Sequence, residues 1–455
     1  MKYFGTDGIR GAYKSELVCE SFFKKFAHCV ELYFKKYAHR DVLKICIGTD
    51  TRESGTSLKK AIISGLSEDT LVFDCGILPT PAVAENIIVS GCDFGFVVTA
   101  SHNQWMDNGV KIFNANGEKL SVFEENEIEK IIDSVTGSIP EHQHYNVIDF
   151  HERAVENFCK KYKKFLPRDA LFGKKIVIDS ANGATCCVVE KIFKNFGANI
   201  IHIGCNPNGR NINDNCGSEH VESIMLAMKN SGAFIGFAND GDGDRVVIFD
   251  ENGDRVDGDV LIGLLAKDMI LHKKLPNKTV VVTHQSNFGL DRFIESIGGN
   301  VIRCDTGDRN VYQSMVKNDC WFGGENSGHL IFRGFSPVGD GISAALFAIS
   351  LVANSREKLS KMKTKVALFP QKSFNIIVGE KVPLEKIGGL KDAIDSIDNS
   401  LDDPHRIVVR YSGTEPKLRV LVEAGTQTSV DHAWTNIRDA IIESFDKSGI
   451  SATKE

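Results

Sequence analysis

Three aspartates at alternate positions are the strongest chemical signal in this sequence. They lie in the run Asp240-Gly241-Asp242-Gly243-Asp244-Arg245, directly after the apolar stretch 233–238. The intervening glycines allow one short loop to turn several carboxylate oxygens toward a single point, and hard divalent cations prefer such oxygen ligands. Without a cation, three negative charges this close would repel one another. We therefore predict a site for a Mg²⁺-type ion, bound by Asp240, Asp242 and Asp244.

An EF-hand is the main alternative for this loop. The three aspartates would then occupy loop positions 1, 3 and 5 with Glu251 at position 12, and the chain would be a non-catalytic Ca²⁺-binding scaffold. Position 6, however, is Arg245, where the sharp turn of an EF-hand needs glycine. Both flanks, 234–238 and 246–249, also look like strands, whereas an EF-hand needs helices. The sequence therefore favours the Mg²⁺-type site.

Three stretches of the chain repeat one plan that would position such loops. Each has a short apolar strand, a polar turn, a helix and a second strand, which is the βαβ arrangement of a parallel sheet. A further apolar strand follows in each stretch and ends in a polar loop. Ligands of open α/β sheets gather beyond the carboxyl ends of the strands, so we expect three related domains around one shared cleft. The first strands begin near residues 44, 175 and 279, and the polar loops near residues 99, 239 and 323.

The expected fold class is α/β with four domains around a central cleft. Three would be similar mixed α/β domains of the βαβ type, and the fourth a smaller C-terminal α+β domain. A chain of 455 residues is too long for a single hydrophobic core, which agrees with several domains. The predicted domains are 1–152 with the serine loop, 153–256 with the aspartate loop, 257–367 with the third polar loop, and 368–455.

Composition and charge exclude several classes of partner. The net charge of −6 disfavours nucleic acid or an anionic membrane as the main partner. The chain has no apolar signal region and no uninterrupted apolar run long enough to span a bilayer. Its twelve cysteines form no CxxC pair, and we interpret them as reduced, mostly buried thiols. We therefore expect a cytoplasmic protein with neither a nucleic-acid nor a membrane partner.

Ser101 follows the last strand of the first repeat, within the segment 99–104 (TASHNQ). A hydrolase serine is disfavoured because the GxSxG elbow is absent, and a plain polar turn is the simplest alternative. A phosphorylated serine would carry about −1.5 to −2 charges and could supply an oxygen ligand to a cation held by the three aspartates. The nearby segment 107–111 is expected to form a turn that places the cation Lys111 beside a transferring phosphoryl group.

Three further segments have residues that suit phosphates or sugars. Segment 410–419 combines hydroxyls, a glycine and three cations, as a phosphate cradle requires. Segment 325–329 offers side chains of the kind that bind sugar hydroxyls, although a loop bonded to itself would look the same. Segment 5–11 is weaker taken alone, since it could be a turn with a salt-bridged arginine. The candidate residues of these segments are Arg10, Glu325, Ser327, His329, Arg410, Ser412, Gly413, Thr414 and Arg419, and Arg245 of the aspartate loop is a further candidate anion contact.

Together these loops resemble those of the α-D-phosphohexomutases, most closely the bacterial phosphoglucosamine mutase branch. The similar stretches occur in the same order over nearly the whole chain. Two positions depart from the usual pattern: Gln104 replaces a proline, and Asn326 stands where glutamine or methionine is usual. The matching stretches are FGTDGIRG from Phe4, TASHN and DNGVKIF between Thr99 and Phe113, NDGDGDR from Asn239, GENSGH from Gly324, and RYSGTEPKLRVLVE from Arg410.

The resemblance implies a reversible 1,6-phosphoryl transfer on a hexose phosphate. Ser101 would be a phosphoserine that binds Mg²⁺ together with the three aspartates, and a hexose 1,6-bisphosphate would be the activating intermediate. The implied reaction interconverts glucosamine 6-phosphate and glucosamine 1-phosphate for UDP-N-acetylglucosamine synthesis. A phosphomannomutase/phosphoglucomutase with the same mechanism is the alternative, and the enzyme could be a monomer or a homodimer.

The resemblance also implies roles for the other candidates. Arg10, Lys111 and Arg245 would surround the moving phosphoryl group, and either Lys111 or His329 would move the hydroxyl proton. The sugar hydroxyls would be held by Glu325 and Ser327. The phosphate that does not react would be held by Arg410, Ser412, Gly413, Thr414 and Arg419.

Overall fold

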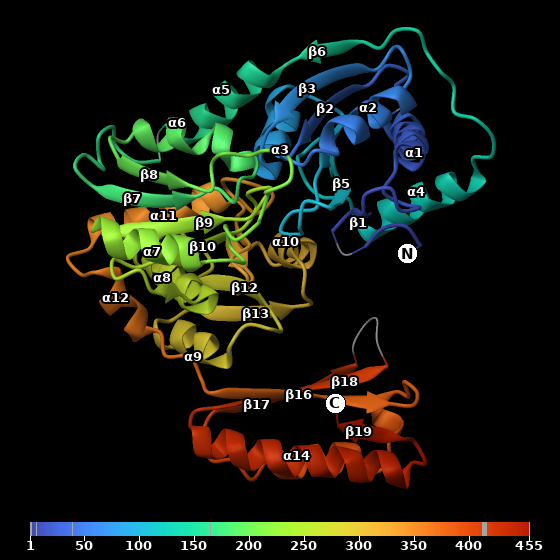
Figure 1. Cartoon of the computed structure of the whole chain (residues 1–455). Helices are drawn as coiled ribbons and strands as arrows, with labels where there is room; N and C mark the ends of the chain where they lie inside the picture. The colour runs from blue at the N-terminus through green and yellow to red at the C-terminus, as the bar shows by residue number, and fades with distance from the viewer. Residues whose placement is uncertain (1, 6, 39, 164, 412–415, 455) are drawn as a thin grey trace. The chain divides into compact units, whose positions relative to one another are not determined.

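The computed structural model describes residues 2–5, 7–38, 40–163, 165–411 and 416–454. The chain forms two compact units, one made of Met1–Gln285 with Gly299–Lys365 and the other of Ser286–Gly298 with Val366–Glu455. The first unit contains three separate β-sheets with their helices, and the second contains a fourth sheet (Figure 1).

The first sheet is six-stranded, with the order β1-β5-β4-β2-β3-β6. Its strands β4, β2, β3 and β6 are parallel neighbours, whereas β5 runs antiparallel to both β4 and β1. Phe26 of α1 packs on Phe96 of β4 in its buried core. The elements are β1 (Ile9–Ala12), α1 (Glu20–Ala38), β2 (Lys44–Thr49), α2 (Gly55–Gly65), β3 (Leu71–Ile77), α3 (Thr80–Val89), β4 (Phe94–Val98), β5 (Asp107–Asn114), α4 (Val122–Ser134) and β6 (Val147–Asp149).

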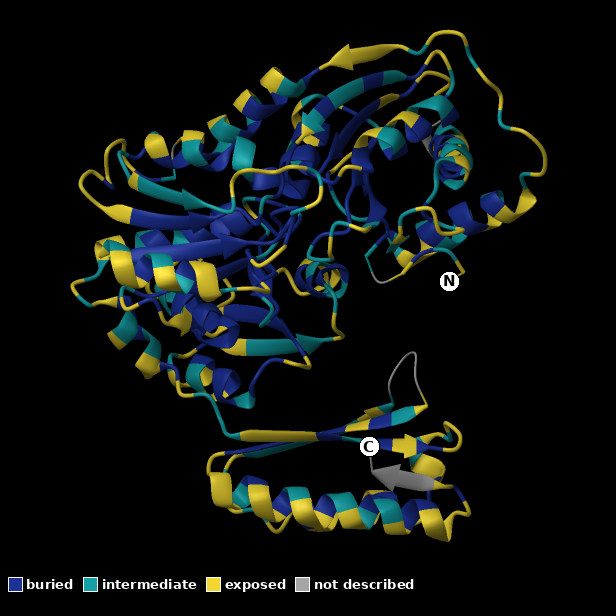
Figure 2. Ribbon diagram, in the orientation of Figure 1, coloured by how far each residue is buried: buried dark blue, intermediate teal, exposed yellow. Residues whose placement is uncertain are grey.

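The second sheet has the order β11-β10-β9-β7-β8. Strands β8, β7 and β9 are parallel, and β10 is antiparallel to β9. Every residue of β9 and β10 is buried, so the aspartate loop between them begins and ends inside the protein (Figure 2). The elements are α5 (His151–Tyr162), β7 (Lys175–Asp179), a 3₁₀ turn (Ala184–Cys187), α6 (Val189–Lys194), β8 (Asn199–Ile203), α7 (Glu222–Ser231), β9 (Ile235–Asn239), β10 (Val246–Phe249) and β11 (Arg255–Val256).

The third sheet has the order β13-β12-β14-β15. Helices α8 and α11 are apolar along most of their length and largely buried. Each begins at an aspartate whose side chain accepts a backbone N–H of the first turn, Asp257 for α8 and Asp340 for α11. The elements are α8 (Gly258–Leu271), β12 (Thr279–Thr283), β13 (Asn300–Cys304), α10 (Asp308–Lys317), β14 (Phe322–Gly324), β15 (Leu330–Phe332), α11 (Gly341–Asn354), α12 (Leu359–Met362) and a 3₁₀ turn (Lys363–Lys365).

The second unit is built on the antiparallel sheet β17-β18-β16-β19. Its long helix, α14, shares a buried core with the sheet. This core includes Ile437, Ile441 and Phe445 of the helix and Val420 and Val422 of the sheet. That helix accordingly shows alternating buried and exposed residues along its length (Figure 2). The elements are α9 (Phe288–Ser296), β16 (Gln371–Val378), a 3₁₀ turn (Leu384–Lys386), α13 (Leu390–Asp398), β17 (His405–Tyr411), β18 (Lys417–Ala424), α14 (Gln427–Lys447) and β19 (Ala452–Lys454).

The three sheets of the first unit share one four-stranded motif. In each, a central strand pairs in parallel with two neighbours, and the second neighbour continues into an antiparallel strand. The repeated strand pairs predicted from the sequence are therefore confirmed. The polar loops are the equivalent hairpin connections β4–β5, β9–β10 and β14–β15, which explains why they have corresponding positions in the fold.

Two local predictions from the sequence are wrong. Segment 107–111 is not a turn, because it forms the start of β5 and pairs with β4 on one side and β1 on the other. The third polar loop, expected to begin near residue 323, begins later, because strand β14 runs from Phe322 to Gly324 and pairs with β12 and β15. Lys111 is consequently held by a strand and not by a flexible loop.

Candidate active site

The three equivalent loops meet in one cavity of the first unit, of about 570 Å³. The N-terminal segment closes one part of its wall, and helix α10 contributes its first residue. The predicted shared cleft is thereby confirmed. The lining includes Asp7, Arg10, His102, Asp244, Arg245, Asp308, Glu325, Asn326, Ser327 and His329.

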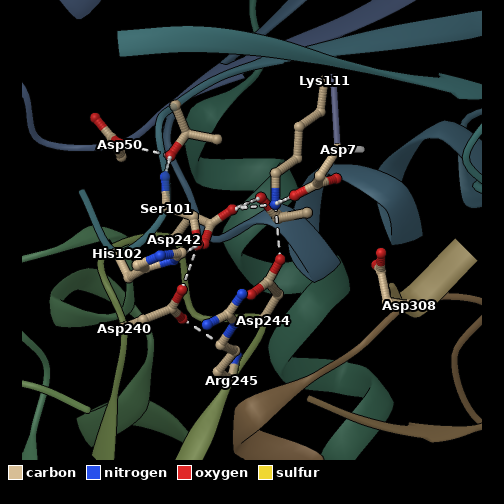
Figure 3. Close-up of polar contacts among 12 residues, drawn as sticks. Asp7, Asp50, Ser101, His102, Lys111, Asp240, Asp242, Asp244, Arg245 and Asp308 are labelled. Carbon is tan, nitrogen blue, oxygen red and sulfur yellow. Dashed lines mark hydrogen bonds and ion pairs between the residues drawn. The ribbon is translucent and has the colours of Figure 1, made fainter. Parts of the chain in front are cut away.

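Ser101 and Asp240 are in direct contact, although they come from different sheets. The Oγ atom of Ser101 donates to Oδ2 of Asp240 over 2.6 Å (Figure 3). The serine is almost fully buried, at 1% exposure, and its φ of 51° lies in the left-handed region that non-glycine residues rarely adopt. The two loops pack so closely that a Cβ on Gly241 would lie 2.7 Å from the carbonyl oxygen of Ser101.

The aspartate loop fits a divalent cation. Asp240, Asp242 and Asp244 are buried, and each offers one oxygen within 4.8 Å of the others. The Oδ1 atoms of Asp242 and Asp244 are buried and have no hydrogen-bond partner within the described part of the chain. Burial, together with the charges of Asp244 and Asp242, raises the pKa of Asp240 well above its ordinary value. A bound cation would supply the missing contacts and relieve this repulsion.

The flanks of the aspartate loop exclude an EF-hand. They are the antiparallel strands β9 and β10, whereas an EF-hand loop connects two helices. Glu251, the twelfth residue of the supposed Ca²⁺ loop, turns away and accepts hydrogen bonds from Ser360. The Ca²⁺-scaffold hypothesis in its EF-hand form is therefore wrong.

Lys111 reaches the aspartate loop from strand β5. Its Nζ atom lies 2.8 Å from Oδ2 of Asp242, 2.7 Å from Oδ2 of Asp244 and 3.1 Å from Oδ2 of Asp7 (Figure 3). Burial alone would lower the pKa of Lys111, but these carboxylates hold it well above its ordinary value. Lys111 is therefore a permanent positive charge in this arrangement, at the side of the loop that faces the first domain.

Two arginines predicted for the site also line the cavity. Arg10 of β1 forms an ion pair with Asp7, and the backbone N–H of Arg245 donates to Oδ1 of Asp240 over 3.1 Å. The buried Nε atoms of both arginines have no hydrogen-bond partner among the described residues. Nearby carboxylates, including those of Asp7 for Arg10 and Asp240 for Arg245, raise the pKa of each guanidinium despite its burial. Each thus presents a charged group to the cavity.

His329 lies between two carboxylates. Its Nε2 atom is 3.1 Å from Oδ2 of Asp308, and its Nδ1 atom is 3.6 Å from Oδ1 of Asp244. Burial alone would lower the pKa of His329, but Asp308 and Asp244 raise it above its ordinary value. These carboxylates therefore favour the protonated form of the ring at the cavity wall.

The third loop positions Glu325 and Ser327 at the cavity. Glu325 is largely buried and accepts the N–H of Gly307 over 3.0 Å at Oε1. The turn at Gly328 has a φ of 90°, and a Cβ there would collide with the carbonyl oxygen of Val246, so only glycine fits. This close approach joins the third loop to the end of the aspartate loop.

The remaining candidates belong to the second unit. Arg410 on β17 and Arg419 on β18 are directly opposite one another in the antiparallel pair. Their side chains consequently emerge on the same face of the hairpin, which places two positive charges side by side. Ser412, Gly413 and Thr414 lie outside the described residues.

Sequence reasoning missed several residues of this cavity. His102 lines the cavity, and its Nδ1 atom lies 3.5 Å from Oγ of Ser101. Asp7 and Asp308 form ion pairs with Lys119 from opposite sides. Asp7 could have been predicted, because it lies in the same glycine-rich segment as Arg10. No sequence motif around Lys119 or Asp308 indicates a role for either residue. Lys119 is separated in the chain from Asp7 by 112 residues and from Asp308 by 189 residues.

Comparison with known proteins shows the family. Four models of the phosphoglucomutase/phosphomannomutase family match the chain: alpha/beta/alpha domain I over residues 1–137, domain II over 154–253, domain III over 257–368, and the C-terminal domain over 374–440. The phosphoglucosamine mutase of Lactococcus lactis subsp. cremoris is 36% identical over 97% of this chain and 98% of its own length.

Solved structures agree on the fold. A phosphoglucomutase/phosphomannomutase family protein from Burkholderia thailandensis has a TM-score of 0.78 at 20% identity, covering 98% of both chains. The N-acetylphosphoglucosamine mutase of Aspergillus fumigatus, solved in complex with GlcNAc-6P and magnesium, has a TM-score of 0.65 at 18% identity and covers 97% of this chain and 96% of that one.

The chain belongs to the phosphoglucomutase/phosphomannomutase family. The predicted fold, three α/β domains followed by a C-terminal domain, is confirmed, and so is the predicted class of enzyme, an isomerase of the phosphohexomutase type. All twelve cysteines are free thiols, and of these Cys205 alone is exposed. Within the described part of the chain, none of the helices has the length and apolar character needed to cross a membrane.

Proposed function

We propose that this chain is a Mg²⁺-dependent phosphoglucosamine mutase, which interconverts glucosamine 6-phosphate and glucosamine 1-phosphate. The observation that carries the proposal is the 2.6 Å contact between Ser101 Oγ and the buried aspartate loop. It is the relationship that a serine must have if its phosphate is to share a cation with these carboxylates. The name of the 36% identical relative supports glucosamine phosphate as the substrate.

Asp240, Asp242 and Asp244 would hold the Mg²⁺ ion, and a phosphate on Ser101 would complete its oxygen ligands. The bound ion would neutralise charge that develops on the phosphoryl oxygens during transfer. Arg10, Arg245 and Lys111 add fixed positive charge around the same oxygens. Phosphoryl transfer depends mainly on such positioning and charge stabilisation, and the burial of these groups strengthens both.

The reaction consists of two phosphoryl transfers with opposite directions. In the first, the bond between Ser101 Oγ and phosphorus breaks as a bond forms to the 1-hydroxyl oxygen of glucosamine 6-phosphate, giving the 1,6-bisphosphate. The bisphosphate then turns in the cavity and returns its 6-phosphate to Ser101, which releases glucosamine 1-phosphate. His329 would give a ring proton to the oxygen that loses phosphate and take up the hydroxyl proton, while Lys111 stays charged.

Two groups of residues would hold the rest of the substrate. Glu325 and Ser327 line the cavity and offer hydrogen bonds to the sugar hydroxyls. The phosphate that does not react would be bound by Arg410, Ser412, Gly413, Thr414 and Arg419. The cross-strand position of Arg410 and Arg419, which puts two cations on one face of the hairpin, supports this assignment.

A comparison of substrates tests the proposal. With Mg²⁺ and catalytic hexose 1,6-bisphosphate, the purified protein should isomerise glucosamine 6-phosphate with a higher kcat/KM than glucose 6-phosphate or mannose 6-phosphate. A preference for glucose or mannose phosphate would instead identify a phosphomannomutase/phosphoglucomutase. Tight Ca²⁺ binding without mutase activity on any of the three would reject the enzyme in favour of a binding protein.

We also propose a cytoplasmic location and a monomeric or homodimeric state. The free thiols support a reducing compartment. Light scattering coupled to gel filtration would give the number of subunits, and cell fractionation would give the location. A larger oligomer, or a protein recovered with membranes, would overturn these two parts of the proposal.

A further inference from the structure

A fully buried arginine holds the backbone of the serine loop. The side chain of Arg52 has 0% exposure, and it comes from the turn that follows β2. Its guanidinium donates to four carbonyl oxygens, three in the loop and one at the first residue of β5: to Ser101 over 3.0 Å, to Asn103 over 2.7 Å, to Gln104, and to Asp107 over 2.9 Å. A charged fork that binds four neighbouring carbonyls constrains the path of the whole loop.

Asp50 orients this arginine and also reaches the serine itself. Its Oδ2 atom accepts Nε of Arg52 over 2.9 Å, and its Oδ1 atom accepts the backbone N–H of Arg52 over 3.0 Å. Oδ2 also accepts the hydroxyl of Thr99 over 2.6 Å, and the Thr99 hydroxyl oxygen accepts the N–H of Ser101 over 2.9 Å. The same pair therefore holds both backbone polar groups of the serine.

Asn213 approaches the serine loop from the second domain. Its Nδ2 atom donates to the carbonyl oxygens of Ser101 over 2.8 Å and Asn103 over 2.9 Å. Asn213 is buried, and its φ of 57° is one that asparagine and aspartate tolerate better than most residues. The carbonyl of Ser101 is thus bound by Arg52 from its own domain and by Asn213 from the neighbouring one.

We propose that Arg52 and Asn213 are positioning residues, which keep the serine loop in the conformation that places the Ser101 hydroxyl on the aspartate loop. Two features of the serine loop make such residues necessary. Ser101 has a left-handed backbone, which persists only where its surroundings impose it. Gln104 gives the loop no proline ring to stiffen it. A displacement of a reacting atom by about 1 Å can cost about 100-fold in rate.

The inference rests on the proposed function and predicts a particular kinetic pattern. Loss of the hydrogen bonds from Arg52 or Asn213 to the serine loop should lower kcat, because the phosphoryl group is then misplaced. It should leave KM nearly unchanged, because the proposed sugar contacts Glu325 and Ser327 come from a different loop. A residue with only a structural role would reduce the amount of folded enzyme without this pattern.

The substitution Asn213→Asp removes the hydrogen bonds of Asn213 to the serine loop with little change in the shape of the side chain. It replaces the donating Nδ2 by a carboxylate oxygen, which repels the two carbonyls, and it keeps a residue type suited to the backbone. Asn215→Asp is the matched control, because Asn215 is exposed, has a similar φ of 53° and donates from its side chain to Asp214 and not to the serine loop. We expect kcat to fall about 10- to 100-fold in the first variant and to stay unchanged in the second.

A single-turnover experiment locates the defect. Protein phosphorylated on Ser101 is mixed with saturating glucosamine 6-phosphate and Mg²⁺, and loss of phosphate from the protein is followed by quenched flow. The rate of transfer should fall in Asn213→Asp by the same factor as kcat. Equal transfer rates in Asn213→Asp and wild type would overturn the inference, as would a rise in KM at constant kcat. If wild-type protein itself transfers no phosphate, the proposed function fails first.

Arg52→Lys provides a second test from the other side of the loop. Lysine keeps the charge opposite Asp50 but cannot bind several carbonyls with a planar fork. We expect the same loss of kcat at nearly constant KM in protein with a wild-type circular dichroism spectrum. Full activity of the folded variant would contradict the role of Arg52. Should Arg52→Lys not fold, Asn213→Asp alone decides.

Discussion

Ser101 and Asp240 occupy equivalent hairpin loops of two different sheets, and the hydroxyl of the first donates to the carboxylate of the second over 2.6 Å. The contact joins the serine that is the candidate for phosphorylation in one domain to a candidate cation ligand of the next. A repeated domain can build such a site because its hairpin loops end at corresponding places. The proposed phosphoryl transfer depends on this contact.

Ser101→Ala should abolish turnover while leaving the fold intact. The substitution removes the oxygen that carries phosphate, together with one hydrogen bond that contributes about 1 kcal/mol. Activity should become undetectable, whereas substrate should still bind in a calorimetric titration and thermal unfolding should change little. Ser134→Ala is the control, since its exposed hydroxyl bonds only to Ile131 O of its own helix. Activity in the Ser101 variant near that of wild type would end the phosphoserine proposal.

Removal of divalent cations should abolish activity, and Mg²⁺ should restore it. Asp242→Asn should weaken binding of Mg²⁺ measured by isothermal titration, because it removes one of three converging charges. The reduction should be about tenfold or more, in the range found when metal-site groups are altered. Asp254→Asn is the matched control, since Asp254 is exposed and lies beyond β10. Undiminished activity in chelator, or equal Mg²⁺ affinity in both variants, would contradict a metal site here.

Gly241→Ala should damage both stability and activity. The added methyl group would meet the Ser101 carbonyl oxygen at 2.7 Å and Nδ2 of Asn213 at 2.8 Å, so the two loops would have to separate. Overpacking of this kind costs about 1–3 kcal/mol. Gly388→Ala is the control, because a Cβ there would lie 4.0 Å from Ser448 Oγ, the nearest described atom apart from those of its chain neighbours. Denaturant unfolding and kcat measure the two effects; a Gly241 variant as stable and active as wild type would show that the loops are not in contact.

Glu129 should make the N-terminal segment sensitive to acid. Its carboxylate accepts the backbone N–H groups of Lys2, Tyr3 and Phe4 over 2.7–3.0 Å, and this segment leads to Asp7 at the cavity. Burial alone would raise the pKa of Glu129, but these three N–H groups outweigh it and lower the pKa below the ordinary value of 4.5.

A lowered pKa in the folded state sets the sign of the effect. The stabilisation is fully present above pH 4.5 and is lost as the pH falls below it, because protonation then weakens three charge-assisted hydrogen bonds. Hydrogen exchange at the amides of Tyr3 and Phe4, compared with wild type at equal pH, should be faster in Glu129→Gln. That difference should shrink in acid. Exchange rates that match wild type at pH 7 would show that Glu129 does not anchor the segment.

The sequence could predict features that depend on short-range patterns. Asp240, Asp242 and Asp244 lie within one loop, so their spacing alone indicates converging oxygens. The pattern 107–109 (DNG), by contrast, is typical of a turn, yet these residues form the start of β5, because strand β1 pairs with them. Tertiary pairing here outweighs the local preference.

Sequence patterns could not predict contacts between segments that are far apart in the chain. Arg52 looks like an ordinary residue of a polar turn, and its role becomes visible only when the serine loop, 49 or more positions later, folds over it. Asn213 lies in a coil segment without any motif, 112 positions from Ser101. Such long-range contacts depend on how whole domains pack, which no local spacing encodes.

The most direct test of the central claim is to follow the phosphate on Ser101 through one reaction cycle. Freshly purified protein is analysed by intact mass spectrometry and peptide mapping, before and after incubation with glucosamine 6-phosphate and Mg²⁺. The proposed mechanism requires one phosphate, mapped to Ser101, which leaves with substrate and returns when a hexose 1,6-bisphosphate is added. An enzyme that turns over fully while Ser101 is never phosphorylated would contradict it.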